Sequence, residues 1–259
     1  HIECSAMSMK YLGETFDLHV GGEDLIFPHH ENEIAQSEGA TGHPFVRHWV
    51  HVKHLMIDDE TMSKSKGNFF TIPDILEKGH RADAIRYLLA GSHYRKPLNF
   101  GFEGLHQAAA ALDRIHGLAK RLDEVEGDGP EGLIAEVCAG ARREFSEALA
   151  DDLNTPEALA AVHGLVSRAN ALLAEGQLTQ AGATAVRKTL EEMNGVFGVF
   201  VPTATEDGLS AEEQALFDER QDARKERDFA RADAARDKLE ALGVVLEDTP
   251  KGTRWRRTS

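Results

Sequence analysis

The stretch FPHHENEIAQ, residues 27–36, crowds imidazoles and carboxylates at the expected start of a helix. Residues four positions apart share one face of a helix, so His29 and Glu33 point the same way, while His30 falls on the side of Ile34. Zinc accepts both imidazole and carboxylate ligands, but exposed His/Glu pairs at this spacing are common. The pair alone therefore leaves two interpretations open, half of a zinc site or a solvated helix face.

Cys4 strengthens the metal hypothesis. A free cysteine ahead of a strand and a helix is more often a small buried hydrophobe. However, Cys, His and Glu together form a mixed ligand set that zinc accepts, and three protein ligands leave room for a fourth. The second cysteine, Cys138, falls in an expected helical region, where we expect it only to pack.

Two polar loops have the composition of nucleotide-binding segments. TMSKSKGN, residues 61–68, carries Lys64 and Lys66, and ammonium groups suit a triphosphate whose leaving pyrophosphate needs charge neutralisation. In GGEDL, residues 21–25, the glycines let a ligand approach the backbone, and Asp24 is placed to hold a ribose hydroxyl. Each motif is weak alone, because an ordinary polar turn explains it.

The N-terminal elements that must position these residues alternate between strand and helix. Phe16, Leu18 and Val20 alternate, which predicts a strand that the following two glycines break. Pro28 suits a first helical position and predicts a helix over residues 28–37. HWVHVKHLMI, residues 48–57, is typical of a second strand, and the lysine-bearing segment after it is expected to be a loop.

The remainder is predicted to be mainly helical. Helical segments are expected from residue 72 onward, and the helical period dominates from about Gln107. Thr155, followed by a proline, is a candidate N-cap, and Ser210–Glu213 has the pattern of a capping box. After Gly243 the sequence indicates a hairpin with Pro250 and Gly252 in its turn.

Composition bounds the class of protein. The 259 residues suffice for two or more compact units, and 41% hydrophobic content argues against disorder. No apolar run approaches the ~20 residues of a membrane helix, and no signal peptide is visible. Two cysteines are too few for a disulfide framework. We therefore expect a cytoplasmic monomer with no membrane segment. The net charge of −15 argues weakly against general polyanion binding, while local basic patches can still hold one nucleic acid.

Several segments together resemble the bacterial cysteinyl-tRNA synthetases, which are class I aminoacyl-tRNA synthetases. The matching segments, in order, are HIECSAM, HVGGEDLIFPHHENEIAQ, MSKSKGNF, RYLLAGSHYRKPLNF, DDLNTPEA and ARADAARDKLEALGVVLEDTPKGTRWRR. The resemblance covers essentially the whole chain and implies an α/β fold that becomes mainly α. It implies the rear of a Rossmann-type catalytic domain over 1–72, a stem-contact segment over 73–120, a helical bundle over 121–202 and a small α+β anticodon domain over 209–259.

The resemblance also implies roles for residues of the catalytic part. Cys4, His29 and Glu33 match three of the family's four zinc ligands, and the fourth, a Cys, lies outside this chain. Lys64 matches the second lysine of the KMSKS loop, which stabilises the activation transition state, and His19 matches a histidine of the amino-acid pocket. Two further residues bear on ATP binding. Thr61 stands where the family has the first KMSKS lysine, and Lys66 can partly substitute for that missing lysine. Asp24 stays the candidate ligand of the ATP ribose.

The C-terminal tail is basic and aromatic on an acidic chain, which suits unstacked RNA bases, although a solvated charged helix pair is the simpler interpretation from composition. By resemblance, four residues match positions that contact or stack on anticodon bases: Arg224, Phe229, Asp233 and Asp248. Trp255 is expected to pack in the hairpin.

The implied function is ligation of cysteine to cysteine tRNA with ATP and Mg as co-substrates and one zinc that selects the substrate thiol. The family's N-terminal strand and HIGH-type ATP motif are not in this chain, so we expect the chain alone to be inactive. Two alternatives remain open. One is the cysteine–amino-sugar ligase of mycothiol biosynthesis, which lacks the anticodon domain, and the other is a non-catalytic tRNA-binding remnant.

Overall fold

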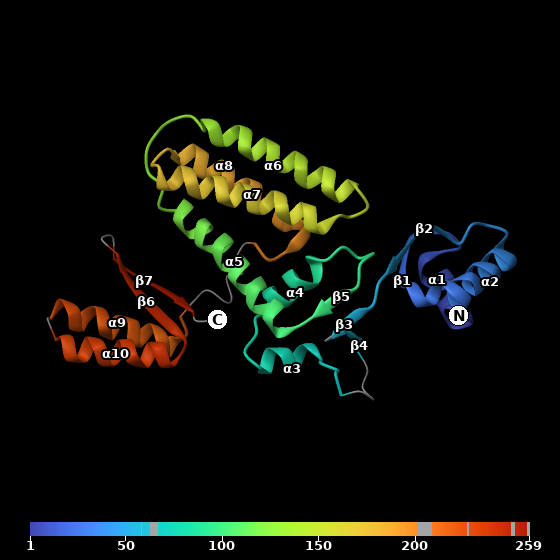
Figure 1. Ribbon diagram of the computed structural model, residues 1–259, viewed down its shortest axis with the longest axis horizontal. Helices are drawn as coiled ribbons and strands as arrows, with labels where there is room; N and C mark the ends of the chain where they lie inside the picture. The colour runs from blue at the N-terminus through green and yellow to red at the C-terminus, as the bar shows by residue number, and fades with distance from the viewer. Residues whose placement is uncertain (58, 63–66, 201–208, 227, 250–251, 258–259) are drawn as a thin grey trace.

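The computed structural model describes residues 1–57, 59–62, 67–200, 209–226, 228–249 and 252–257 (Figure 1). The molecule is elongated. A small α/β unit that carries the N-terminus lies at one end, a helix pair with a hairpin lies at the other, and a helical bundle lies between them. Within the described residues, no helix is long and apolar enough to cross a membrane.

The N-terminal unit has two helices and a two-stranded parallel sheet. Its elements are α1 (Ile2–Leu12), β1 (Phe16–Gly22), a 3-10 turn (Glu23–Leu25), a π turn (Ile26–His30), α2 (Glu31–Thr41) and β2 (Val46–Val52). β1 pairs with β2 in register from Phe16–Val46 to Gly22–Val52. The ring of Phe45, which is fully buried, packs edge-on against that of Phe16 with centroids 5.0 Å apart.

One local prediction for this unit is wrong and another is supported. The glycine pair does not break β1 but forms its last two residues, and a Cβ on Gly21 would lie 2.6 Å from Cε1 of His30. The glycine is therefore needed for close approach of the imidazole. The predicted helix start at Pro28 agrees with the backbone dihedrals, because Phe27 is the only residue of Ile26–His30 outside the helical region. Residues 28–30 run directly into α2, which begins at Glu31 and ends at Thr41, four residues beyond the predicted end.

The expected strand over residues 48–57 is two strands in two sheets. β2 ends at Val52, and β3 (Leu55–Ile57) pairs in parallel with β5 (Leu98–Phe100) and antiparallel with β4 (Glu60–Thr61). The chain changes partners at Lys53, whose N–H donates to the carbonyl of Tyr94 at 2.9 Å. A single-strand prediction fails here because the apolar pattern does not report which strand is the neighbour.

The helical part consists of α3 (Ile72–Glu77), α4 (Ala82–Ala90), α5 (Phe102–Leu122), α6 (Leu133–Ala150), α7 (Thr155–Ala174) and α8 (Gln180–Phe197). One core joins α4 and α5 to α6–α8, and it contains Cys138, which is 1% exposed and packs as expected. Thr155 is not the N-cap of α7. The side chain of Asn154 caps the helix instead, since it accepts from the N–H of Glu157.

The C-terminal part is the helix pair α9 (Ala211–Lys225) and α10 (Phe229–Ala241) with the hairpin β6 (Val244–Thr249) and β7 (Gly252–Arg257). The capping box of Ser210 and Glu213 is confirmed, as is the hairpin, while its turn residue Pro250 lies outside the described residues. Trp255 packs against the small core of Leu239, Val244 and Leu246.

Candidate metal centre and associated sites

Three elements bring Cys4, His29 and Glu33 together. Cys4 comes from α1, His29 from the π turn and Glu33 from the first turn of α2, and their ligand atoms all lie within 4.8 Å of one another. His29 Nε2 lies 2.9 Å from Glu33 Oε1, so the two side chains share a face, as their spacing indicates. Packing of α1 against α2 supplies the cysteine, and Ser5 Oγ donates to Gln36 Oε1 at 3.0 Å across that contact.

The Glu33 carboxylate is the most unusual group in the cluster. Its side chain is 1% exposed, and neither oxygen has a hydrogen bond of acceptable geometry. His29 lies close to one oxygen, and His19 Nδ1 lies 3.5 Å from the other, but neither ring is oriented to donate. Buried charges in proteins are paired or bind metals, because burial of an uncompensated charge is costly. A thiolate, an imidazole and this carboxylate therefore fit a zinc ion.

A second imidazole group lies on the other side of Glu33. His19 of β1 and His30 also form, with Glu33, a set whose ligand atoms lie within 4.8 Å. His30 is 3% exposed, and its Nδ1 lies 2.9 Å from His51 Nε2. Burial lowers the pKa of His30, against an opposing effect of Glu33, so the ring is neutral at physiological pH. The structure therefore places His30 in the site, beside His19 and Glu33.

Sequence reasoning missed the residues of β2 that complete this group. Trp49 stacks on His19 with ring centroids 4.5 Å apart and an interplanar angle of 19°. Trp49 and His51 are also stacked, with an interplanar angle of 7°. The signal was present in HWVHV, because residues two apart on a strand face the same way. Trp49 therefore packs against both imidazoles that lie beside Glu33, those of His19 and His30.

The proposed nucleotide-binding residues are only partly described. Asp24 is exposed in the 3-10 turn after β1, and a Cβ on Gly22 would lie 2.4 Å from its Oδ1. Glycine at this position therefore permits the carboxylate to lie over the strand end. Thr61 lies exposed on β4. Lys64 and Lys66 lie outside the described residues.

The candidate anticodon residues lie in the C-terminal part. Arg224 is in the last turn of α9, and Phe229, which is 66% exposed, begins α10. Asp233 lies four residues further on and shares the face of Phe229. Asp248 lies on β6, but its side chain is outside the described set. Three of the four residues are therefore placed near one end of the helix pair, and their contact with RNA stays a prediction.

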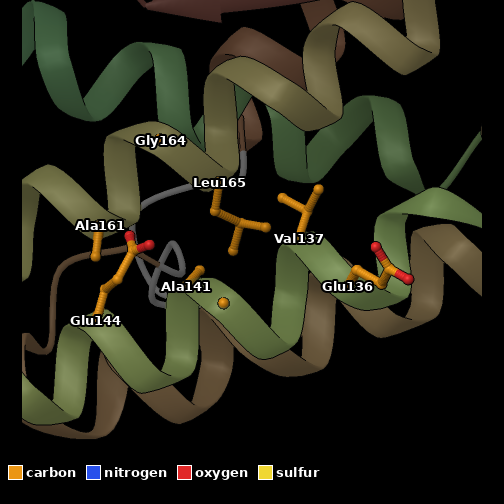
Figure 2. Close-up of a pocket in the computed structure, with 8 residues that line it drawn as sticks. Glu136, Val137, Ala141, Glu144, Ala161, Gly164 and Leu165 are labelled. Atoms are coloured by element: carbon orange, nitrogen blue, oxygen red, sulfur yellow. The ribbon is translucent and has the colours of Figure 1, made fainter.

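A groove elsewhere in the molecule lacks the features of a site. It lies between α6 and α7 and has a volume of about 320 Å³. Figure 2 shows Ala141 and Val137 of α6 facing Ala161 and Leu165 of α7 across it, with two glutamates, Glu136 and Glu144, at its margin. Small side chains explain the space, and carboxylates disfavour a phosphate ligand.

Comparison with known proteins defines the class. The model of the tRNA synthetases class I (C) catalytic domain matches residues 1–110. A solved structure of LeuRS from Agrobacterium radiobacter K84, in a ternary complex with tRNA and LeuAMS, has a TM-score of 0.57 at 19% identity and covers 71% of this chain and 26% of that chain. This likeness concerns the fold alone. The fold and the catalytic-domain match define part of a class I tRNA synthetase.

Two further matches and the curated relatives narrow the class. The DALR domain matches residues 144–201, and the cysteinyl-tRNA ligase anticodon binding domain matches residues 206–256. Cysteine–tRNA ligases from Geobacter sulfurreducens and Solibacter usitatus are 46% and 47% identical over 99% of this chain and 57% and 56% of their own lengths. The chain belongs to the cysteine–tRNA ligase family, and it spans a little over half the length of these relatives.

Proposed function

We propose that the chain forms part of a cysteine–tRNA ligase that activates cysteine with ATP and Mg and transfers it to cysteine tRNA. The observation that carries this proposal is the buried carboxylate of Glu33, which accepts no hydrogen bond of acceptable geometry, beside Cys4 and His29. The match of the anticodon-binding model to residues 206–256 supports tRNA as the acceptor.

The proposed site answers a specific chemical problem. Cysteine and serine have nearly the same shape, and packing alone discriminates poorly between such isosteres. Zinc, when bound, supplies a soft cation that prefers a thiolate to a hydroxyl. Cys4, His29 and Glu33 would hold it together with a ligand from outside this chain. His19 stands 3.5 Å from the second Glu33 oxygen and would line the amino-acid pocket with Trp49 stacked behind it.

Activation requires positioning and charge neutralisation. The cysteine carboxylate attacks the α-phosphate of ATP, and pyrophosphate leaves. We assign Asp24 to the ribose and Lys64, aided by Lys66, to the phosphates, where an ammonium group stabilises the charge of the transition state. Because the family's HIGH-type motif is not in the sequence described here, the chain alone is proposed to be inactive.

Transfer requires recognition of the tRNA. Residues 209–259 are proposed to contact the anticodon through Arg224, Phe229, Asp233 and Asp248, while the segment over 73–120 contacts the stem of the tRNA. A cysteine–amino-sugar ligase does not bind tRNA, so that alternative leaves the C-terminal part without a role. A non-catalytic remnant does not select a substrate thiol, so that alternative leaves the Glu33 cluster without a role. Both alternatives are therefore disfavoured.

Cobalt substitution tests the thiol-selecting site without an activity assay. We expect the chain to bind Co²⁺ with a thiolate-to-cobalt absorption band that cysteine intensifies and serine does not. Cys4→Ser should abolish the band of the protein alone, and Cys138→Ser, the matched control in the helical core, should retain it. Absence of the band, or an identical response to both amino acids, would contradict the proposal.

A further inference from the structure

The N-terminal unit, residues 1–52, is attached to the rest of the molecule at one place. Within the described part of the chain, no hydrogen bond or ion pair joins this unit to residues beyond Lys53. Lys53 makes the connection, since its N–H donates to the Tyr94 carbonyl at 2.9 Å and its Nζ pairs with Glu23 of the 3-10 turn after β1. Figure 1 shows the unit at the end of the molecule, linked through β2 and β3.

The segment that receives Lys53 is itself held by one carboxylate. Asp152 accepts hydrogen bonds from the Tyr94 hydroxyl at 2.5 Å and from the Arg95 guanidinium, one of whose nitrogens is 3.1 Å away. These two donors lower the pKa of Asp152 to about 2. Thr155 Oγ1 adds a bond to the Ser92 carbonyl at 3.4 Å. The segment Ser92–Arg95 is thus fastened to the turn between α6 and α7.

The backbone of that turn is unusual for the residues it contains. Asp152 and Leu153 have φ values of 54° and 56°, in the left-handed region that favours glycine. The conformation is fixed by backbone bonds from Leu153 N–H to Leu149 and from Asn154 N–H to Ala148, at 3.2 and 3.0 Å. Strain of this kind persists where the surroundings over-determine it, often at functional positions. A glycine would relieve the strain but could not supply the carboxylate that meets Tyr94 and Arg95.

We propose that Asp152 is a positioning residue, which holds the segment Ser92–Arg95 and thereby fixes the orientation of the N-terminal unit relative to the helical bundle. The hinge is the link between β2 and β3, where the chain passes from one sheet to another. The inference rests on the proposed function in one respect. The orientation matters because a tRNA bound along the bundle must deliver its acceptor end to the unit that carries Glu33.

A distance measurement tests the orientation independently of function. Spin labels at Ala40→Cys on α2 and Ser146→Cys on α6, both exposed positions, would report the spacing of the two parts in a Cys4→Ser background. Cys138, at 1% exposure, stays unlabelled. We expect a narrow distance distribution in the parent chain and a wider one in Asp152→Asn. Glu192→Gln, which removes a charge from the exposed ion pair of Arg142 and Glu192 between α6 and α8, is the matched control and should leave the distribution unchanged.

Tyr94→Phe removes only the hydroxyl bond and keeps the test valid if Asp152→Asn fails to fold. A wider distribution with Tyr94→Phe supports the proposal. Distributions identical to that of the parent in every folded variant would overturn it and leave Asp152 as a residue that only stabilises its turn.

Nuclease footprinting of cysteine tRNA adds the functional readout. The parent chain should protect both the anticodon and the acceptor end, and Asp152→Asn should lose protection of the acceptor end alone. Retention of both protections, despite a widened distance distribution, would refute the role in tRNA placement. Absence of any protection by the parent chain would instead refute the proposed function, and the distance result would still decide the role of Asp152.

Discussion

Removal of the Glu33 charge should have opposite effects on stability with and without metal. In the metal-free protein, Glu33 is 1% exposed, and neither of its oxygens accepts a hydrogen bond of acceptable geometry. The imidazoles of His29 and His19, at 2.9 and 3.5 Å, compensate the desolvated carboxylate only where they carry a proton. An unsatisfied buried polar group costs about 1–3 kcal/mol, and a charged one costs more. Glu33→Gln keeps the shape and removes the charge. We therefore expect metal-free Glu33→Gln to be more stable than the metal-free parent by roughly 1–3 kcal/mol.

Zinc should reverse this order. A ligand at 100 times its dissociation constant stabilises a folded protein by about 2.7 kcal/mol, and the variant, with one ligand weakened, should gain much less. The parent should then be the more stable protein at saturating zinc. The sign change is specific to a carboxylate whose partner is the metal, because a merely structural glutamate would destabilise the protein when replaced in both conditions.

Trp49 is a suitable reporter, since its ring stacks on His19 next to Glu33. Urea unfolding would be followed by its fluorescence in a Trp255→Phe background, once with chelator and once with zinc. Glu38→Gln is the matched control on the same helix, because Glu38 Oε1 accepts a bond from the Phe45 N–H at 3.1 Å. That variant should be neutral or destabilised in both conditions. If metal-free Glu33→Gln is less stable than the parent, Glu33 has a partner other than metal and the reasoning is wrong.

Three further outcomes are expected. In a protein that includes the whole catalytic domain, Lys64→Ala should lower the rate of adenylate formation by about 10²-fold or more. The affinity for cysteine should change little. A rate of pyrophosphate exchange equal to that of the parent would contradict the role of Lys64. Phe229→Ala should weaken binding of cysteine tRNA by roughly 1–3 kcal/mol, the range for loss of one base–aromatic stack, and an unchanged titration by fluorescence anisotropy would exclude stacking there. The pKa of Asp152 is lowered from 3.8 to about 2, so its contribution to stability is present above pH 4 and is lost as pH falls toward 2. The difference in thermal unfolding between the parent and Asp152→Asn should accordingly shrink as pH falls from 4 toward 2 and vanish below pH 2, and a difference that stays constant from pH 5 to pH 2 would contradict the assigned ion pairing.

Local features were predictable because short-range geometry fixes them. The shared face of His29 and Glu33 follows from their spacing on a helix, and the capping box of Ser210 and Glu213 involves residues three apart. The quoted motifs also indicated the family, and the matches over residues 1–110, 144–201 and 206–256 bear this out. No alternative packing of the chain changes which residues are neighbours within one helical turn.

Predictions failed where the outcome depended on distant segments. Periodicity could not show that the strand over residues 48–57 divides, because the division follows from the bond between Lys53 and the distant Tyr94. Both Asn154 and Thr155 are acceptable caps by type, and the turn that contains Asp152 decides which one serves. Helical spacing indicates the side on which His30 lies, but it could not show that His51 of the distant β2 comes within 2.9 Å of the ring.

The sequence by itself determined the family, the helical and hairpin character of the C-terminal half and the pairing of one histidine with one glutamate. The family resemblance also named Cys4 with that pair. Tertiary structure alone decided that Glu33 is buried without a hydrogen bond of acceptable geometry, that His30 meets His51 and that Asp152 holds Tyr94. The physical reason is that residue spacing sets direction within a helix or strand, whereas burial and charge compensation depend on which segments pack together, and only the folded chain brings residues 4, 29 and 33 into one cluster.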